Sequence, residues 1–174
     1  MRNFRFSNVV NHLIQFCYLG IVFFVPVYFA FFLEGNSIFE LNKLVLFKSL
    51  VSILLFLTLV KLLFYSQDFL GILRTKRIRS FVIPGMFIFV LLLATIFSDF
   101  RELSFWGEYT RQQGWLTHIH YFLFYILLIL NIDSRQKIKK VLYAVGISSL
   151  VVSVYGILQI WGWDIFTWIE SPQN

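Results

Sequence analysis

The residues with the most varied chemistry stand together in one short segment, 98–115, between two strongly apolar runs. It contains the stretch Ser104-Phe105-Trp106-Gly107-Glu108-Tyr109-Thr110-Arg111-Gln112-Gln113-Gly114. Arg111 offers a planar fork of N–H donors that suits a phosphate or a carboxylate. Four aromatic residues of the segment can rest at the level of lipid headgroups and hold it against a bilayer; they are Phe105, Trp106, Tyr109 and Trp115. The alternative is that Glu108 and Arg111, three residues apart, merely pair with each other.

The helix expected directly after this segment adds to its chemistry. Residues 116–132 are predicted to be helical, and Gly114 lets the chain turn into that helix. The first N–H groups of a helix lack internal partners and carry the positive end of the helix dipole. Together with Arg111 they form a candidate site for an anionic headgroup or a pyrophosphate.

Other polar residues give weaker signals. His118 and His120 are two residues apart and point away from each other on a helix, so we expect interfacial histidines and no metal site. The phosphate-binding, dinucleotide, zinc-protease and hydrolase motifs are missing from the sequence, and we predict no cofactor.

Gln159 lies near the end of the last apolar run, where it can bond a neighbouring helix or a substrate. Small residues recur on one face of that run and favour close helix packing; they are Gly146, Ser149, Ser153 and Gly156.

The composition shows what must surround these residues. Of 174 residues, 59% are apolar and 14% charged, with 22 Phe and a mean hydropathy of +0.76. Ordinary globular chains carry about 25% charged residues, so this chain lacks the polar surface to cover itself in water. A secreted disulfide scaffold, a disordered tail and a compact cytosolic enzyme are excluded, and the lipid bilayer is the expected partner. The single cysteine, Cys17, cannot form an intrachain disulfide.

The apolar runs predict an all-α fold, a polytopic transmembrane bundle of about five membrane-spanning helices. Crossing a hydrocarbon core of about 30 Å takes about 20 helical residues. The runs that qualify are 13–33, 44–65, 81–97, 116–132 and 141–161. Pro26 is expected to kink the first helix.

The basic residues predict the orientation of the bundle, because Lys and Arg are retained on the cytoplasmic side. Lys43, Arg101 and Arg111 fall in one set of alternate loops. Ten of the 15 basic residues fall in the other set, namely Arg2, Arg5, Arg74, Lys76, Arg77, Arg79, Arg135, Lys137, Lys139 and Lys140. We therefore predict the N-terminus inside and the C-terminus outside. Topology and anionic headgroups explain the net charge of +6, so no nucleic-acid partner is expected.

The outer segment resembles a known family. The residues Phe105-Trp106-Gly107-x-Tyr109-x-Arg111-Gln112-Gln113-Gly114-x-Leu116-Thr117, preceded by Ser98-Asp99, are similar to the outer loop of bacterial O-antigen ligase-like membrane proteins, whose superfamily also holds the O-antigen polymerases. Two weaker similarities keep the same order along the chain. They are Phe39-Glu40-Leu41-x-Lys43, and Tyr155-Gly156-Ile157-Leu158-Gln159 followed by Gly162-x-Asp164.

The resemblance implies a multi-pass glycosyltransferase of the bacterial inner membrane. Such proteins take a glycan from an undecaprenyl diphosphate carrier at the periplasmic face and join it to an acceptor hydroxyl, without a metal or a nucleotide sugar. Residues 1–174 would then be the N-terminal helices of a larger protein, inactive without its missing C-terminal helices. By analogy, Arg111 is the first candidate for a substrate contact, followed by Lys43 and Gln159.

A second function class stays open, a non-catalytic membrane bundle or a transporter subunit. Ion and proton pathways usually require ionisable groups within the membrane. Lys48 and Lys61 lie near the ends of their predicted helix, where they can reach the headgroups. This arrangement argues against a transporter, whereas the chemistry of the segment 98–115 argues against a purely structural bundle.

Overall fold

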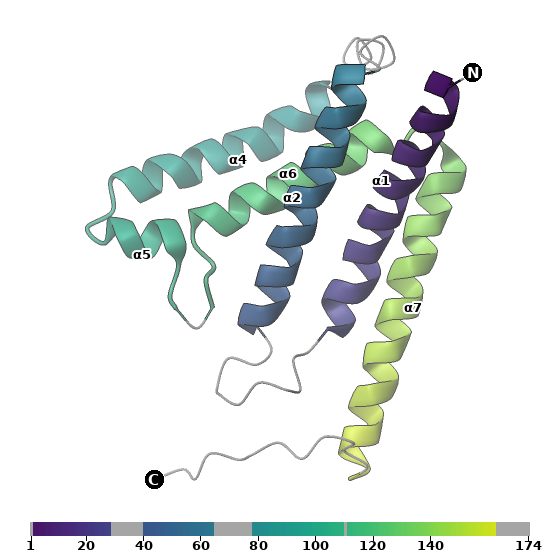
Figure 1. Ribbon diagram of the computed structural model, residues 1–174. Helices are drawn as coiled ribbons and strands as arrows, with labels where there is room; N and C mark the ends of the chain where they lie inside the picture. Colours follow the sequence, from purple (N-terminus) through teal and green to yellow (C-terminus); the bar gives the residue numbers. More distant parts are fainter. Residues whose placement is uncertain (1, 29–39, 65–77, 110, 163–174) are drawn as a thin grey trace.

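In the computed structural model, every regular element of the described residues is a helix. The structure describes residues 2–28, 40–64, 78–109 and 111–162. The helices are α1 (Arg2–Val27), α2 (Glu40–Phe64), α4 (Ile78–Ile96), α5 (Arg101–Trp106), α6 (Trp115–Asn131) and α7 (Arg135–Ile160) (Figure 1). The predicted all-α fold is confirmed.

Three of these helices are long and apolar enough to cross a membrane. They are α1 from Asn8, α2 from Leu41 and the whole of α7. Two shorter apolar helices, Ser80–Ile96 and Trp115–Asn131, coincide with the predicted third and fourth crossings. The structure therefore has the helices of a membrane protein. The count of about five crossings, and the orientation with the N-terminus inside and the C-terminus outside, stay predictions.

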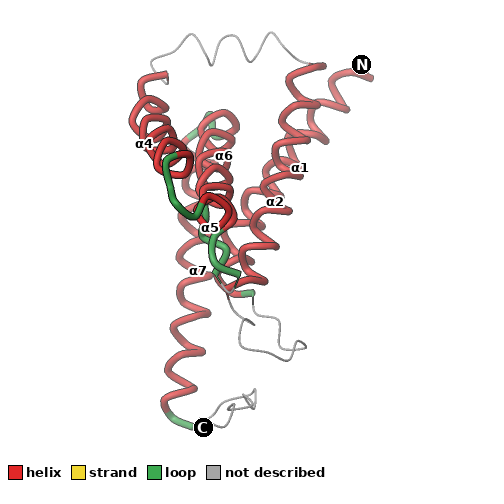
Figure 2. Tube along the Cα trace, turned by 90° about the vertical axis from the view of Figure 1, so that its left-hand side faces the viewer, coloured by secondary structure: helices red, strands yellow, loops and turns green. Residues whose placement is uncertain are grey.

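The helices alternate in direction. α1 and α2 lie side by side, α7 runs along the other side of α1, and α4 and α6 are inclined to these three (Figures 1 and 2). The start of α1, the end of α2 and the turn between α6 and α7 lie at one end of the bundle. The connection between α5 and α6 reaches toward the opposite end, where α1 ends and α2 begins (Figure 1). The connection between α5 and α6 and the turn between α6 and α7 thus lie at different ends of the bundle.

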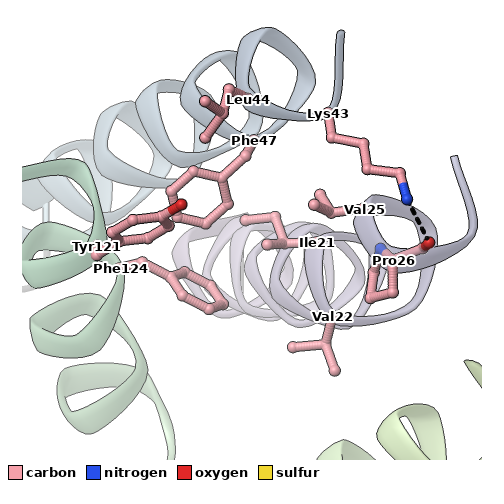
Figure 3. Close-up of a pocket in the computed structure, with 9 residues that line it drawn as sticks. All are labelled: Ile21, Val22, Val25, Pro26, Lys43, Leu44, Phe47, Tyr121 and Phe124. Carbon is pink, nitrogen blue, oxygen red and sulfur yellow. Dashed lines mark hydrogen bonds between the residues drawn. The ribbon is translucent and has the colours of Figure 1, made fainter. Parts of the chain in front are cut away.

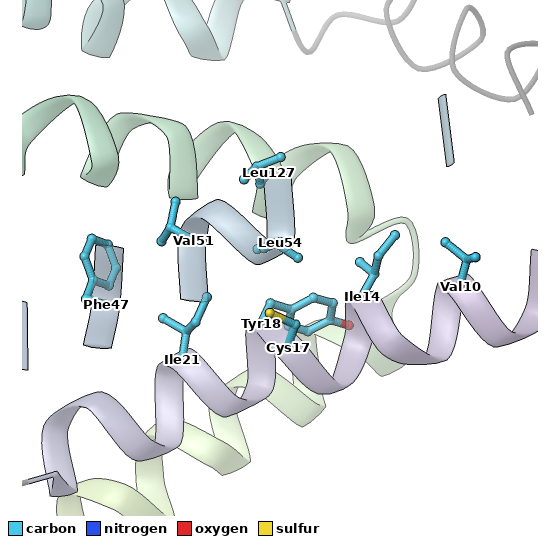
Figure 4. Close-up of a cluster of buried hydrophobic side chains, with 9 residues drawn as sticks. All are labelled: Val10, Ile14, Cys17, Tyr18, Ile21, Phe47, Val51, Leu54 and Leu127. Carbon is cyan, nitrogen blue, oxygen red and sulfur yellow. The ribbon is translucent and has the colours of Figure 1, made fainter. Parts of the chain in front are cut away.

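The core is an apolar cluster between α1, α2 and α6 (Figure 4). Ile14, Tyr18 and Ile21 recur at helical spacing on one face of α1 and are almost fully buried. Val51 and Leu54 of α2 are completely buried against them. This packing fixes α6 relative to the first two helices, and α6 in turn carries the loop that precedes it.

A buried hydrogen bond joins α6 to α2 near the end of this core. The amide of Asn131 donates to the Thr58 hydroxyl (3.1 Å) and to the Leu127 carbonyl (2.9 Å). The Thr58 hydroxyl itself donates to the Leu54 carbonyl (2.8 Å). Polar side chains that bond across helices in apolar surroundings stabilise the packing modestly, by about 0.6 kcal/mol on average.

Two of the predicted helices have wrong boundaries. The first helix was expected over 13–33, but α1 begins at Arg2 and ends at Val27; residues 29–33 lie outside the described residues. Pro26 stands next to the last residue of α1, where the helix stops, instead of at a mid-helix kink. The last helix was expected from 141, but α7 begins at Arg135 because the Ser134 side chain accepts a hydrogen bond from the Lys137 N–H (3.4 Å) and caps it.

The turn between α6 and α7 is held by an ion pair. Lys137 Nζ lies 2.9 Å from Asp133 Oδ1 and donates to the Asn131 carbonyl (3.2 Å). Partial burial raises the pKa of the Asp133 carboxyl, but the hydrogen bond and charge of Lys137 outweigh it, so the pKa lies below its ordinary value. The pair sits on a basic turn that the sequence assigns to the cytoplasmic side.

α7 buries little of its surface within the described chain. Among the described residues of α7, only Ser148 is buried. The helix packs along α1. A Cβ added to Gly146 or Gly156 would meet nothing within 4 Å. The predicted face of small residues is therefore open in the part of the chain that the structure describes.

Candidate functional site

The connection between α4 and α6 contains a helix that the sequence analysis missed. α5 (Arg101–Trp106) packs on α4 and α6. Its start is organised by Ser98, whose hydroxyl oxygen accepts hydrogen bonds from the Phe100 N–H (3.2 Å) and the Ser104 hydroxyl (2.7 Å). A polar residue just before a short helix is the signal that could have revealed it.

Two glycines close the rest of the connection into a tight loop. Gly107 follows α5 with a positive φ of 87°, a conformation that favours glycine. Gly114 precedes α6 in an extended conformation. A Cβ on either residue would overlap backbone atoms of the other residue and its neighbours. The backbone at Gly107 therefore contacts the backbone at Gly114. We call the segment from one glycine to the other the 107–114 loop; its residue 110 lies outside the described residues.

The sequence predicted Gly114 for a different reason. We expected it to allow a turn into the helix, but its φ of −80° and ψ of −177° are open to any residue. What requires glycine here is the absence of a side chain at the crossing with Gly107. Spacing along the chain cannot indicate such a contact, because it depends on how α5 packs back on α6.

Aromatic side chains attach this loop to the helices. The Trp115 indole N–H donates to the Ile88 carbonyl of α4 (3.4 Å), and its ring centroid lies 5.6 Å from that of Phe105. Trp106 and Tyr109 are exposed. Of the four aromatic residues predicted to lie at headgroup level, two pack into the bundle and two point outward.

A buried threonine fixes the far end of the loop. Thr117, in the first turn of α6, is fully buried, and its hydroxyl donates to the Gln112 carbonyl. Gln112 has a positive φ of 47°, an uncommon conformation for a residue with a side chain. Sequence reasoning gave Thr117 no role; a hydroxyl in the first turn of a helix is the available signal.

Arg111 lies within the 107–114 loop, four residues before Trp115, the first residue of α6. Its N–H donates to the Glu108 carbonyl (3.1 Å), as does the Gln112 N–H (2.6 Å). Both the Arg111 and Glu108 side chains are exposed. The structure thus joins these two residues through a backbone turn and leaves the Arg111 side chain exposed.

The two histidines of α6 bond to their own helix. His118 Nδ1 lies 3.0 Å from the Gly114 carbonyl and His120 Nδ1 lies 2.7 Å from the Leu116 carbonyl. The His118 ring also packs edge-on against Phe87 of α4 (6.4 Å between centroids). These contacts hold the rings against α6 and α4, and the interfacial role stays a prediction.

Lys43 lies in the first turn of α2. Its Nζ donates to the Pro26 carbonyl near the end of α1 (3.1 Å) and lines a pocket between α1, α2 and α6 (Figure 3). The last turn of a helix leaves carbonyl groups without internal partners, and a positive charge there is favourable. Lys43 therefore joins two helices whether or not it contacts a ligand.

Gln159 is the last residue but one of α7. Its amide donates to the Tyr155 hydroxyl one turn earlier on the same helix (3.1 Å). Neither Gln159 nor Arg111 lines the pocket that contains Lys43. The three predicted substrate contacts thus come from different places, α7, the 107–114 loop and the start of α2, and the described structure does not gather them in one cavity.

Comparison of the chain with protein families, with curated proteins and with solved structures gives no match.

Proposed function

We propose that this chain is the N-terminal part of an O-antigen ligase-like membrane glycosyltransferase. In this proposal, the 107–114 loop contacts the diphosphate of an undecaprenyl-linked glycan at the periplasmic face of the bacterial inner membrane. The missing C-terminal helices of the same protein supply the rest of the active site. Glycan passes from the lipid carrier to an acceptor hydroxyl.

The observation that carries the proposal is the exposed Arg111 on a loop that is closed at both ends. The Gly107–Gly114 crossing and the Thr117 bond to Gln112 restrict the backbone around Arg111. The backbone that carries the cation is thus already ordered before a ligand binds, so less backbone entropy is lost on binding. Trp106 and Tyr109, both exposed, stand beside it and suit a position at headgroup level.

This chemistry is what a diphosphate leaving group needs. Negative charge grows on the diphosphate as the glycosidic bond breaks, and in the absence of a metal it is stabilised by arginine forks and by helix N-termini. Arg111 precedes α6, a helix of 17 residues whose first turn faces the same loop. The loop therefore offers both kinds of positive group in one place.

The test replaces Arg111 in the whole protein and measures glycan transfer in membranes. Arg111→Ala is expected to lower transfer by about 10- to 150-fold, the value of one charged hydrogen-bond pair of about 1.5–3 kcal/mol. Arg111→Lys should recover little of this, because a point charge cannot reproduce the bidentate fork. Arg101→Ala, which removes an exposed arginine from α5 in the same connection, is the matched control and should transfer normally.

Two results would count against the proposal. Transfer at the native rate by both Arg111 variants would remove the loop from donor binding. Equal losses in Arg111→Ala and Arg101→Ala would indicate a general dependence on positive charge in this connection instead of a contact made by one guanidinium.

A further inference from the structure

A second site lies outside the 107–114 loop, in the pocket between α1, α2 and α6 (Figure 3). Its volume is about 280 Å³. Ile21 and Phe47 form buried walls, and Phe124 contributes a third apolar wall, with its ring 5.7 Å from that of Phe47. Apolar walls of this kind suit a hydrocarbon chain.

One charged group stands at the rim of this pocket. Lys43 lies at the end of the bundle where α1 stops, beside the exposed Pro26. An ammonium group has three N–H donors, and the Pro26 carbonyl takes one of them. Tyr121, 46% exposed, places a phenol ring on the opposite side of the pocket. The arrangement is amphipathic, with hydrocarbon walls inside and a cation at the edge.

We infer that this pocket holds one acyl chain of an anionic phospholipid, whose phosphate contacts Lys43. Helices as apolar as α1 and α2 are surrounded by phospholipid, so mass action favours occupation of an apolar pocket that opens between them. The positive charge selects anionic over zwitterionic headgroups. The lipid then bridges α1, α2 and α6 at the end of the bundle opposite the α6–α7 turn. The inference does not depend on the proposed donor site.

The test counts lipids bound to the purified chain by native mass spectrometry, after reconstitution with phosphatidylglycerol, phosphatidylcholine or undecaprenyl phosphate. The wild-type chain should retain one phosphatidylglycerol in preference to phosphatidylcholine. Val25→Phe and, separately, Val22→Phe enlarge side chains that line the pocket, leave Lys43 unsubstituted and should abolish retention. Lys43→Gln should lower phosphatidylglycerol affinity by about fivefold, the value of one lysine near a membrane surface.

Lys48→Gln is the matched control, since it removes a lysine from the same helix that does not line the pocket. It should retain phosphatidylglycerol as the wild type does, and circular dichroism of each variant shows whether the helices have formed. Equal retention of the two phospholipids by the wild type would overturn the inference, as would normal retention by both pocket-filling variants. Retention of undecaprenyl phosphate in place of phosphatidylglycerol would assign the pocket to a prenyl chain and overturn the phospholipid assignment.

Discussion

The contact between Gly107 and Gly114 predicts that Gly114→Ala opens the loop that carries Arg111. The added Cβ would lie 2.5 Å from the Trp106 carbonyl carbon, whereas unstrained carbon atoms stand about 3.5–4.0 Å apart. The atoms in the way belong to the backbone of Phe105, Trp106 and Gly107. No flexible side chain can move aside, so the crossing itself must separate.

The size of the effect follows from this overlap. Overpacking in a well-packed region costs about 1–3 kcal/mol, which corresponds to about a 5- to 150-fold rise in the fraction of open loop. Trypsin cleaves after Arg111 only when the loop opens, and cleavage follows the open fraction when reclosing is fast. Fragments that end at Arg111, measured by mass spectrometry, should therefore accumulate about 5- to 150-fold faster in Gly114→Ala than in the wild type.

Gly146→Ala is the control for this experiment. A Cβ at Gly146 meets nothing within 4 Å, and alanine favours a helix over glycine by about 1 kcal/mol, so cleavage after Arg111 should not change. The reasoning would be refuted by wild-type cleavage in Gly114→Ala, because the crossing would then not hold the loop closed.

Three further predictions concern the end of the 107–114 loop, the hydrogen bond between α2 and α6, and the α6–α7 turn. Thr117→Val should lower the free energy of unfolding by about 1–3 kcal/mol, because it leaves the Gln112 carbonyl without its buried donor; denaturation of the purified chain in mixed micelles measures it. A double-mutant cycle of Asn131→Leu and Thr58→Val should give a coupling of about 0.6 kcal/mol in the same assay, and a coupling of zero would contradict the interhelical bond. Since the pKa of Asp133 is lowered by its lysine partner, its contribution to stability is present above the unfolded pKa of about 3.9 and is lost as the pH falls through the folded pKa. Asp133→Asn should therefore cost about 0.3–0.5 kcal/mol at pH 7, the value of an exposed pair, and progressively less as the pH falls below about 3.9.

The sequence predicts the helices well because apolar length alone decides them. The runs 44–65, 81–97 and 116–132 differ from α2, α4 and α6 by a few residues at each end. The error at the start of α7 comes from local chemistry, since Ser134 caps a helix that runs through basic residues assigned to a loop. The error at α1 is larger, because that helix covers Arg2–Val27 where 13–33 was expected. An apolar run ends at the first charged residues, but the helix can continue through them.

The candidate site is less accessible from sequence, because its geometry depends on contacts between distant segments. Arg111 and its aromatic neighbours can be singled out by residue type. The crossing of Gly107 with Gly114 and the bond from Lys43 to Pro26 cannot, since each arises only after the helices have packed. Gln159 was named by resemblance as a candidate substrate contact, and in the structure its amide donates to the Tyr155 hydroxyl on its own helix.

The central claim is that the 107–114 loop faces the periplasm, and labelling from one side of the membrane tests it most directly. Glu108→Cys places a thiol on the exposed loop, and Lys139→Cys places one near the exposed start of α7. The native Cys17 is buried, which keeps the background low. With the outer membrane made permeable, a maleimide that cannot cross the inner membrane should label position 108 at once and position 139 only after the inner membrane is opened. Labelling of position 139 with protection of position 108 would contradict the account.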